Sequence, residues 1–129
     1  MTDKEIRITR VVDAPRDAVW KAWTEPWRVA RWWGPKDFTS HGNKIDLRVG
    51  GKYLCNMRDP SGKDFWSTGT YKEIDRPSRL VMTDSFADEQ GNIVPATHYG
   101  IGGDFPLELV VTLTLDDLGD KTGLYLIHS

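Results

Sequence analysis

Apolar residues recur at every second position along much of the chain, which is the pattern of half-buried β-strands. In the stretch 107–115, four apolar residues face one way while Glu108, Thr112 and Thr114 face the other. In the stretch 52–58, Tyr53 and Met57 lie on one face with a cysteine between them. This alternation, bounded by turn residues, predicts strands at 5–12, 45–48, 52–58, 65–74, 80–86, 107–115 and 123–128.

The stretch 13–35 has a helical pattern instead and holds five of the six tryptophans. Trp20, Trp23 and Trp27 are spaced i, i+3, i+7, which would place them on one face of an unbroken helix. Pro26 interrupts that pattern, so the sequence predicts two short helices.

The ends of these two helices are predicted from punctuation residues. Asp13 or Ala14 is expected to cap the first helix, with Pro15 in its first turn. The second helix is expected to begin at Pro26 and to end at Gly34-Pro35. Helices this short need a broad surface to pack against.

The order of elements predicts an α+β protein built on one antiparallel sheet. After the helices, six strands follow in succession, and strands joined by turn-length links pair antiparallel. A strongly twisted sheet of this length curls, and its apolar concave face must be covered. The strand at 65–74 has no purely apolar face and is expected to bend near Gly69. The long irregular segment 87–106 is expected to be functional or mobile.

Composition narrows the function. The 129 residues suit a single domain, 1–129, and the net charge of −2 argues against nucleic acid or an anionic membrane as partner. No apolar run approaches the roughly 20 residues that span a bilayer, and the N-terminus lacks the apolar region of a signal peptide. The single cysteine, Cys55, fits a reducing compartment, so we expect a cytoplasmic protein.

The chemistry-bearing residues do not form a recognisable catalytic or metal motif. Cys55 lies in mid-strand among apolar neighbours and is expected to be an inert buried thiol. His41, His98 and His128 are far apart in the sequence, without the spacing of a metal site. We therefore predict no catalytic residue, no metal and no cofactor. Asp84 on an apolar face marks either the polar end of a pocket or an exposed strand end.

Five stretches stand out together: I-T-R-V-V-D-A-P-R-D-A-V-W-K-A-W-T-E-P, R-W-W-G-P, I-D-L-R-V-G-G-K-Y, G-T-Y-K-E-I-D-R-P-S-R-L-V and V-T-L-T-L-D-D. In this combination they resemble the activator-of-heat-shock-protein-90-ATPase-like family, which belongs to the Bet v 1-like and START-like (SRPBCC) superfamily. The resemblance covers nearly the whole chain from about Ile6 to Ser129.

The resemblance implies a helix-grip fold, in which a curved antiparallel sheet wraps around a long C-terminal helix with a cavity between them. Relatives continue past the last strand into that helix, whereas this sequence ends at Ser129. We therefore expect a fragment of a longer protein or a naturally shortened one. The uncovered sheet face is expected to be open, collapsed or filled by a second copy of the chain as a homodimer.

Three functions remain open at this point. The first is a domain that binds a small apolar or aromatic molecule on the concave face of the sheet. The second, suggested by the family's name, is a stress-related co-chaperone with a chaperone as partner. The third is an enzyme of the cyclase or hydrolase type, with Asp84, His98 and Tyr99 as its only acid–base candidates. The residues expected to line the cavity are Trp32, Trp33, Tyr53, Met57, Trp66, Tyr71, Met82, Asp84, Phe86 and His98.

Overall fold

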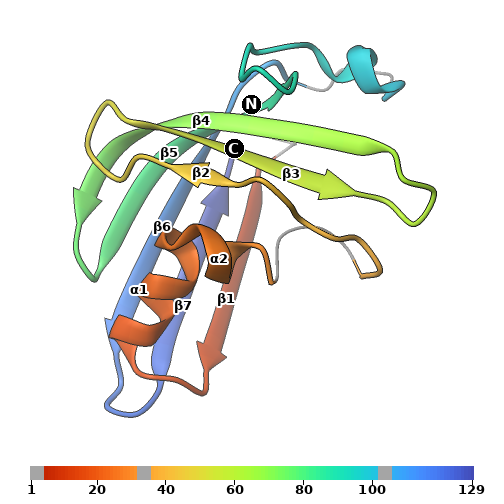
Figure 1. The fold of residues 1–129 in the computed structure, drawn as a ribbon. Helices are drawn as coiled ribbons and strands as arrows, with labels where there is room; N and C mark the ends of the chain where they lie inside the picture. Colours follow the sequence, from red (N-terminus) through yellow and green to blue (C-terminus); the bar gives the residue numbers. More distant parts are fainter. Residues whose placement is uncertain (1–4, 32–35, 102–105) are drawn as a thin grey trace.

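A computed structural model describes residues 5–31, 36–101 and 106–129 of the chain. Strands dominate these residues, and two short α-helices and one 3₁₀ helix complete them (Figure 1). In chain order the elements are β1 (Ile6–Val12), α1 (Arg16–Thr24), α2 (Pro26–Val29), β2 (Lys44–Ile45), β3 (Lys52–Arg58), β4 (Asp64–Asp75), β5 (Arg79–Ala87), η1 (Ala96–Tyr99), β6 (Leu109–Asp117) and β7 (Thr122–His128).

The strands form one sheet in the order β1-β7-β6-β5-β4-β3-β2, and every neighbouring pair is antiparallel. Strands β2 to β7 follow one another as successive neighbours. Short links predict this for most of the pairs, whereas β5 and β6 pair across the long segment between Ala87 and Leu109. The first strand closes the order by pairing with the last, Ile6 opposite His128 and Val12 opposite Thr122. The sheet curves around α1 and α2, which lie on its concave side (Figure 1).

The curvature has a local origin in β4, the longest strand. Its register against β5 shifts between Tyr71 and Glu73, which is a bulge that bends the strand. Gly69, the only glycine of β4, lies two residues before it. The bend expected from the mixed faces of this strand is therefore present, slightly later than Gly69 itself.

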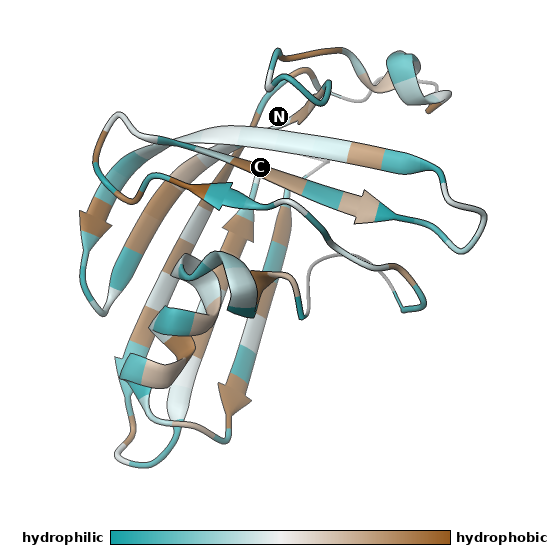
Figure 2. Cartoon of the chain, in the orientation of Figure 1, coloured by the Kyte–Doolittle hydropathy of each residue, from teal (hydrophilic) through white to brown (hydrophobic). Residues whose placement is uncertain are grey.

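The core lies between the concave face and the two helices. Trp20 of α1 is only 1% exposed, and it shares the core with Leu80 and Leu113 from the middle of the sheet. Figure 2 shows the alternation of hydrophobic and hydrophilic residues along the strands that supplies this face. Burial of the alternating apolar residues is the main stabilising contribution to such a fold.

The structure corrects three predicted boundaries. Pro15 is itself the N-cap of α1, with extended backbone angles and no side-chain capping bond, so neither Asp13 nor Ala14 caps the helix. The second helix ends at Val29 rather than at Gly34, which lies outside the described residues. The break at Pro26 turns Trp27 outward, where its side chain is 54% exposed, away from the buried Trp20. The strand predicted at 45–48 is shortened to Lys44–Ile45.

Tyr99 anchors the long segment after β5 to the sheet, in addition to the backbone hydrogen bond from the Val94 N–H to the Phe86 carbonyl. Tyr99, the last residue of η1, packs its ring against Phe65 and Phe86, at centroid distances of 5.3 and 5.7 Å. Its hydroxyl accepts a hydrogen bond from the Trp66 backbone N–H at 3.2 Å and donates one to the Ala87 carbonyl. Trp66 and Ala87 are register partners of β4 and β5, so Tyr99 ties η1 to the end of that ladder.

Candidate functional site

Among the described residues, three cavities on the concave face share Trp23 of α1 as a wall. We define the head cavity, of about 150 Å³, by Trp23, Tyr53, Met82, Asp84, Val111, Leu126 and His128. We define the tail cavity, of about 260 Å³, by Val12, Ala14, Ala18, Val19, Ala22, Trp23 and Leu124. The third cavity is a small gap of about 10 Å³ deeper in the core, lined by Trp23, Val29, Ile45, Tyr53, Cys55, Tyr71 and Met82.

The head cavity combines apolar walls with one polar cluster. The Tyr53 hydroxyl donates to Asp84 Oδ1 at 2.9 Å and also lies 3.1 Å from the Thr83 carbonyl oxygen. His128 Nε2 lies 3.2 Å from Asp84 Oδ2, at ion-pair distance, although the two atoms are not aligned for a hydrogen bond. One carboxylate thus joins residues from β3, β5 and β7.

Tyr53 reaches Asp84 because Gly69 leaves room on the strand between them. Tyr53 and Gly69 are register partners of β3 and β4, and Asp84 lies on the next strand, β5. A Cβ atom on Gly69 would lie 2.5 Å from the Tyr53 ring and 1.8 Å from the Thr83 carbonyl oxygen. The absent side chain therefore lets the ring of Tyr53 cross β4 and deliver its hydroxyl to Asp84.

Burial controls the protonation of the groups behind the cavity. Desolvation by burial raises the pKa of Tyr53 well above its usual range, and the negative charge of Asp84 raises it further. Tyr53 therefore stays a neutral phenol and acts as a hydrogen-bond donor. Burial likewise raises the pKa of the Cys55 thiol to about 12, and Cys55 is 2% exposed. Cys55 is thus a buried thiol, as its mid-strand position predicts.

Asp84 and His128 keep contact with the opening of the head cavity. Their side chains retain 24% and 26% of their exposure, whereas Tyr53 is 3% exposed. A molecule that enters the cavity would meet the Asp84 carboxylate first, with the phenol of Tyr53 behind it. Carboxylate oxygens accept hydrogen bonds only, so this end of the cavity is suited to a group that donates one.

Four of the residues expected to line a cavity do so. Tyr53, Met82 and Asp84 are walls of the head cavity, and Tyr71 borders the small gap in the core. Trp32 and Trp33 lie outside the described residues.

The other four expected lining residues belong to none of these three cavities. Met57 and Phe86 share the concave face with Tyr53 and Asp84 by strand parity, but farther along their strands. Trp66 points to the opposite face of β4 from Phe65, and its ring lies near Gly42. His98 is exposed on η1, where its ring contacts that of Tyr99 at 4.8 Å.

Sequence reasoning did not identify His128, Val111 and Leu126 as partners of Asp84. Their proximity depends on register, which places Met82, Val111 and His128 side by side on β5, β6 and β7. Asp84 on β5 and His128 on β7 both occupy alternating positions that face the concave side. This shared orientation is the signal in the sequence that could have identified the pair. Trp23 was named only as part of the helical pattern, and its role as a shared wall depends on how α1 docks.

Two of the three acid–base candidates lie away from the cavity. Tyr99 uses its hydroxyl to bridge Trp66 and Ala87, and His98 packs beside it. Ala87 is three residues beyond Asp84, about 10 Å along an extended strand. Within the described ranges, no group of three or more His, Cys, Asp or Glu side chains has the geometry to hold a metal ion. No helix among these residues is long and apolar enough to cross a membrane.

Comparisons with known proteins agree with this architecture. The family model described as "Activator of Hsp90 ATPase homolog 1-like protein" matches residues 13–129. No curated protein matches the sequence.

Solved structures include similar bacterial proteins. A protein from Arthrobacter aurescens, solved by NMR in solution, is 28% identical with a TM-score of 0.80, over 97% of this chain and 67% of its own. A crystal structure of a protein from Chromobacterium violaceum is 29% identical with a TM-score of 0.76, over 97% of this chain and 78% of its own. A Mycobacterium smegmatis protein at 24% identity and a TM-score of 0.78 shares the fold. The helix-grip architecture of the sheet and the two N-terminal helices is thereby confirmed.

Proposed function

We propose that this chain, which belongs to the activator of Hsp90 ATPase homolog 1-like protein family, binds a small apolar or aromatic molecule in the head cavity. The observation that carries the proposal is that the partly exposed carboxylate of Asp84 lines a cavity whose other walls are mainly apolar. Ligand sites in proteins combine apolar walls with a few placed polar groups in this way.

The apolar walls supply the affinity in this proposal. Met82, Val111 and Leu126 offer aliphatic surface, and Trp23 offers an aromatic one. Each square ångström of apolar surface that leaves water contributes about 25 cal/mol. A small probe that is buried there therefore binds weakly but measurably, so titrations extend into the millimolar range.

The polar cluster supplies orientation. Tyr53 holds one oxygen of Asp84 at 2.9 Å, which fixes the carboxylate, while the other oxygen lies toward His128. A ligand hydroxyl or amino group that reaches Asp84 would replace water there with a charge-assisted hydrogen bond. Ligands that present no donor would displace water from the second oxygen of Asp84 without replacing its hydrogen bond, which costs free energy.

A calorimetric titration with aromatic alcohols and matched hydrocarbons tests the proposal. Leu126→Trp fills the head cavity and is expected to abolish binding. Tyr125→Trp, on the neighbouring residue of β7 that points to the outer face and is 42% exposed, is the matched control and is expected to bind normally. The proposal fails if no compound binds to the native chain, or if Leu126→Trp binds as the native chain does.

The co-chaperone and enzyme hypotheses stay predictions, as do the homodimer and the cytoplasmic location. Among the described residues, no specific contact favours a chaperone over another partner. The expectation of a further helix after Ser129 also stays a prediction.

A further inference from the structure

The tail cavity has no role in the function proposed above, although it adjoins the head cavity. Its walls are apolar throughout, from Val12 on β1 and Leu124 on β7 to Ala18 on α1. Trp23 is a wall of both cavities, so the same indole ring lies between them.

Strand β7 connects the two cavities along one face. Leu124, Leu126 and His128 alternate with outward residues and therefore share the concave side. Leu124 lines the tail cavity, whereas Leu126 and His128 line the head cavity. The first and the last of these residues are four positions apart, about 13 Å along an extended strand.

Size favours joint use of the two cavities. Pockets for small ligands typically enclose about 300 Å³ or more. The head cavity holds about 150 Å³ and the tail cavity about 260 Å³, so each alone suits only a ligand below this typical size, whereas the two together reach it. The polarity is also divided, with the Asp84 carboxylate at one end and hydrocarbon at the other.

We propose that the two cavities together bind one elongated amphiphile, with a hydroxyl or amino head at Asp84 and an alkyl tail that passes Trp23 into the tail cavity. This inference rests on the proposed function and names its ligand class. The head must donate a hydrogen bond because the Asp84 carboxylate only accepts. A carboxylate head would place two like charges together and is excluded at that end.

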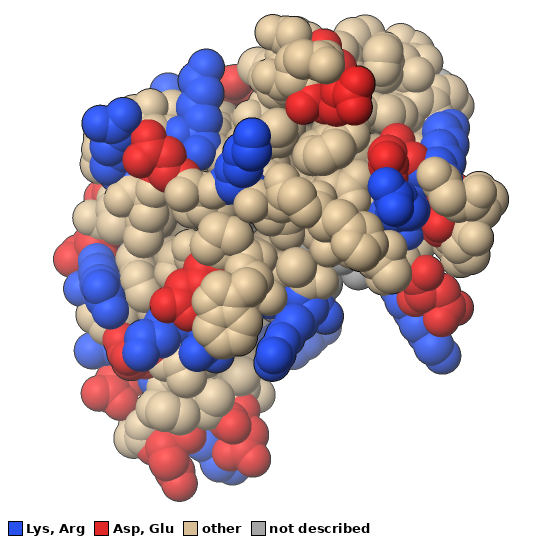
Figure 3. Space-filling model, in the orientation of Figure 1, with Lys and Arg blue, Asp and Glu red and all other residues tan. Residues whose placement is uncertain are grey.

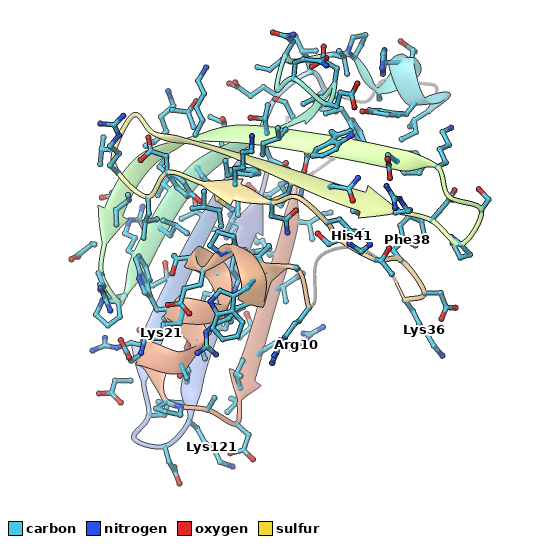
Figure 4. The ribbon with its side chains drawn as sticks, viewed as in Figure 1. Arg10, Lys21, Lys36, Phe38, His41 and Lys121 are labelled. Atoms are coloured by element: carbon cyan, nitrogen blue, oxygen red, sulfur yellow. The ribbon has the colours of Figure 1, made fainter. Side chains whose placement is uncertain are left out.

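A ligand with a carboxylate head would pair with the cation of Arg10 instead of contacting Asp84. Arg10 lies opposite Leu124 in the register and therefore faces the concave side. Because Leu124 lines the tail cavity, Arg10 lies at the tail-cavity end, away from Asp84. Figure 4 shows its side chain beside β1, on the side of the helices. An alkyl carboxylate could therefore bind only in the reverse direction, and Arg10→Gln reveals whether it does.

Chain length is the direct test. Straight-chain alcohols and amines from six to ten carbons are titrated into the native protein below their aggregation concentrations. Each methylene that enters the tail cavity is expected to raise affinity about fourfold, from about 0.8 kcal/mol per buried methylene. Aromatic compounds that fit only the head cavity provide the separate measure of the proposed function.

Two matched substitutions locate the tail. Ala18 lines the tail cavity and is exposed on α1. Ala18→Leu therefore narrows the cavity without overpacking the buried core. We expect this variant to lose the chain-length dependence while it still binds aromatic alcohols. Ala30→Leu, at the C-cap of α2 outside all three cavities, is expected to keep the native dependence.

The head group is resolved by Asp84→Asn. Alkylamines are expected to lose at least tenfold in affinity because an ion pair is removed, and alkyl alcohols less, because an amide oxygen still accepts a hydrogen bond. If amines and alcohols bind Asp84→Asn as they bind the native chain, the head assignment is wrong.

Other outcomes also overturn the inference. Affinity that does not rise with chain length, or an unchanged rise in Ala18→Leu, shows that the tail cavity is not used. If aromatic alcohols still bind, the proposed function survives that failure. If decanoate binds as tightly as decanol and Arg10→Gln abolishes that binding, the orientation is reversed and the proposed head site is wrong.

Discussion

At the scale of single residues, the reach of Tyr53 to Asp84 depends on Gly69. The hydroxyl of Tyr53 crosses a whole strand to meet the carboxylate, and Gly69 is the only glycine in that strand. The sequence pointed to this glycine as the place where β4 bends. The structure shows that it also leaves space for the tyrosine ring.

Gly69→Ala is predicted to destabilise the fold and to weaken ligand binding. The new methyl group would meet the Thr83 carbonyl and the Tyr53 ring, and such overpacking costs roughly 1–3 kcal/mol or more. Urea unfolding measures the loss, and Gly123→Ala on β7 is the control, because a Cβ atom there would meet its nearest neighbours only at 3.4 Å or more. A Gly69→Ala variant as stable as the native chain would show that Tyr53 does not need this space.

Cys55 is predicted to contribute stability that is lost at alkaline pH. Its folded-state pKa of about 12 lies above the ordinary value of 9.0, so the unfolded chain loses the thiol proton first. The contribution is complete below pH 9 and declines as pH rises from 9 toward 12, by about 1.4 kcal/mol between pH 8 and pH 10.

Unfolding free energies measured from pH 7 to pH 11 check this prediction. Cys55→Ala should remove the part of the decline that begins near pH 9. The part due to Tyr53 and Tyr71, whose pKa values burial also raises, should remain and begin near pH 10. An identical pH profile for Cys55→Ala and the native chain would contradict the assignment to this thiol.

At the scale of elements, Tyr99 is predicted to hold η1 to the sheet. Tyr99→Phe keeps the ring contacts with Phe65 and Phe86 but removes the hydroxyl that bridges Trp66 and Ala87. We expect the free energy of unfolding to fall by about 1–2 kcal/mol and the amide of Trp66 to exchange faster.

His98→Ala, beside Tyr99 on η1, should leave both stability and ligand binding near native values, because His98 is exposed. Loss of ligand binding in His98→Ala would return that residue to the site.

The strands were predictable and the site only in part, for one physical reason. Alternation of apolar residues is local, so β3 was predicted with its observed ends, Lys52–Arg58, and the concave positions of Tyr53 and Met82 followed. The contact of Asp84 with His128 depends on how β5, β6 and β7 align, which no single strand records. Helix ends also depended on tertiary packing, since α2 stops at Val29 without a glycine there.

At the scale of the whole molecule, the charged surface differs from the apolar head cavity. Positive and negative side chains are interspersed over the face shown in Figure 3, which is the side on which α1 and α2 lie, in keeping with a net charge of −2. Such a surface gives no strong attraction to a polyanion. The head cavity instead offers apolar walls and the carboxylate of Asp84 to a ligand. Recognition in this account is therefore by burial and one hydrogen bond.

The most direct measurement is an NMR titration of the ¹⁵N-labelled chain with 2-naphthol, a rigid aromatic probe with one hydroxyl donor. The account predicts saturable shifts at the amides of Tyr53, Asp84, Val111 and Leu126, and their loss in Leu126→Trp but not in Tyr125→Trp. No saturable shift up to the solubility limit would contradict the account. Shifts confined to residues outside the head cavity would contradict it equally.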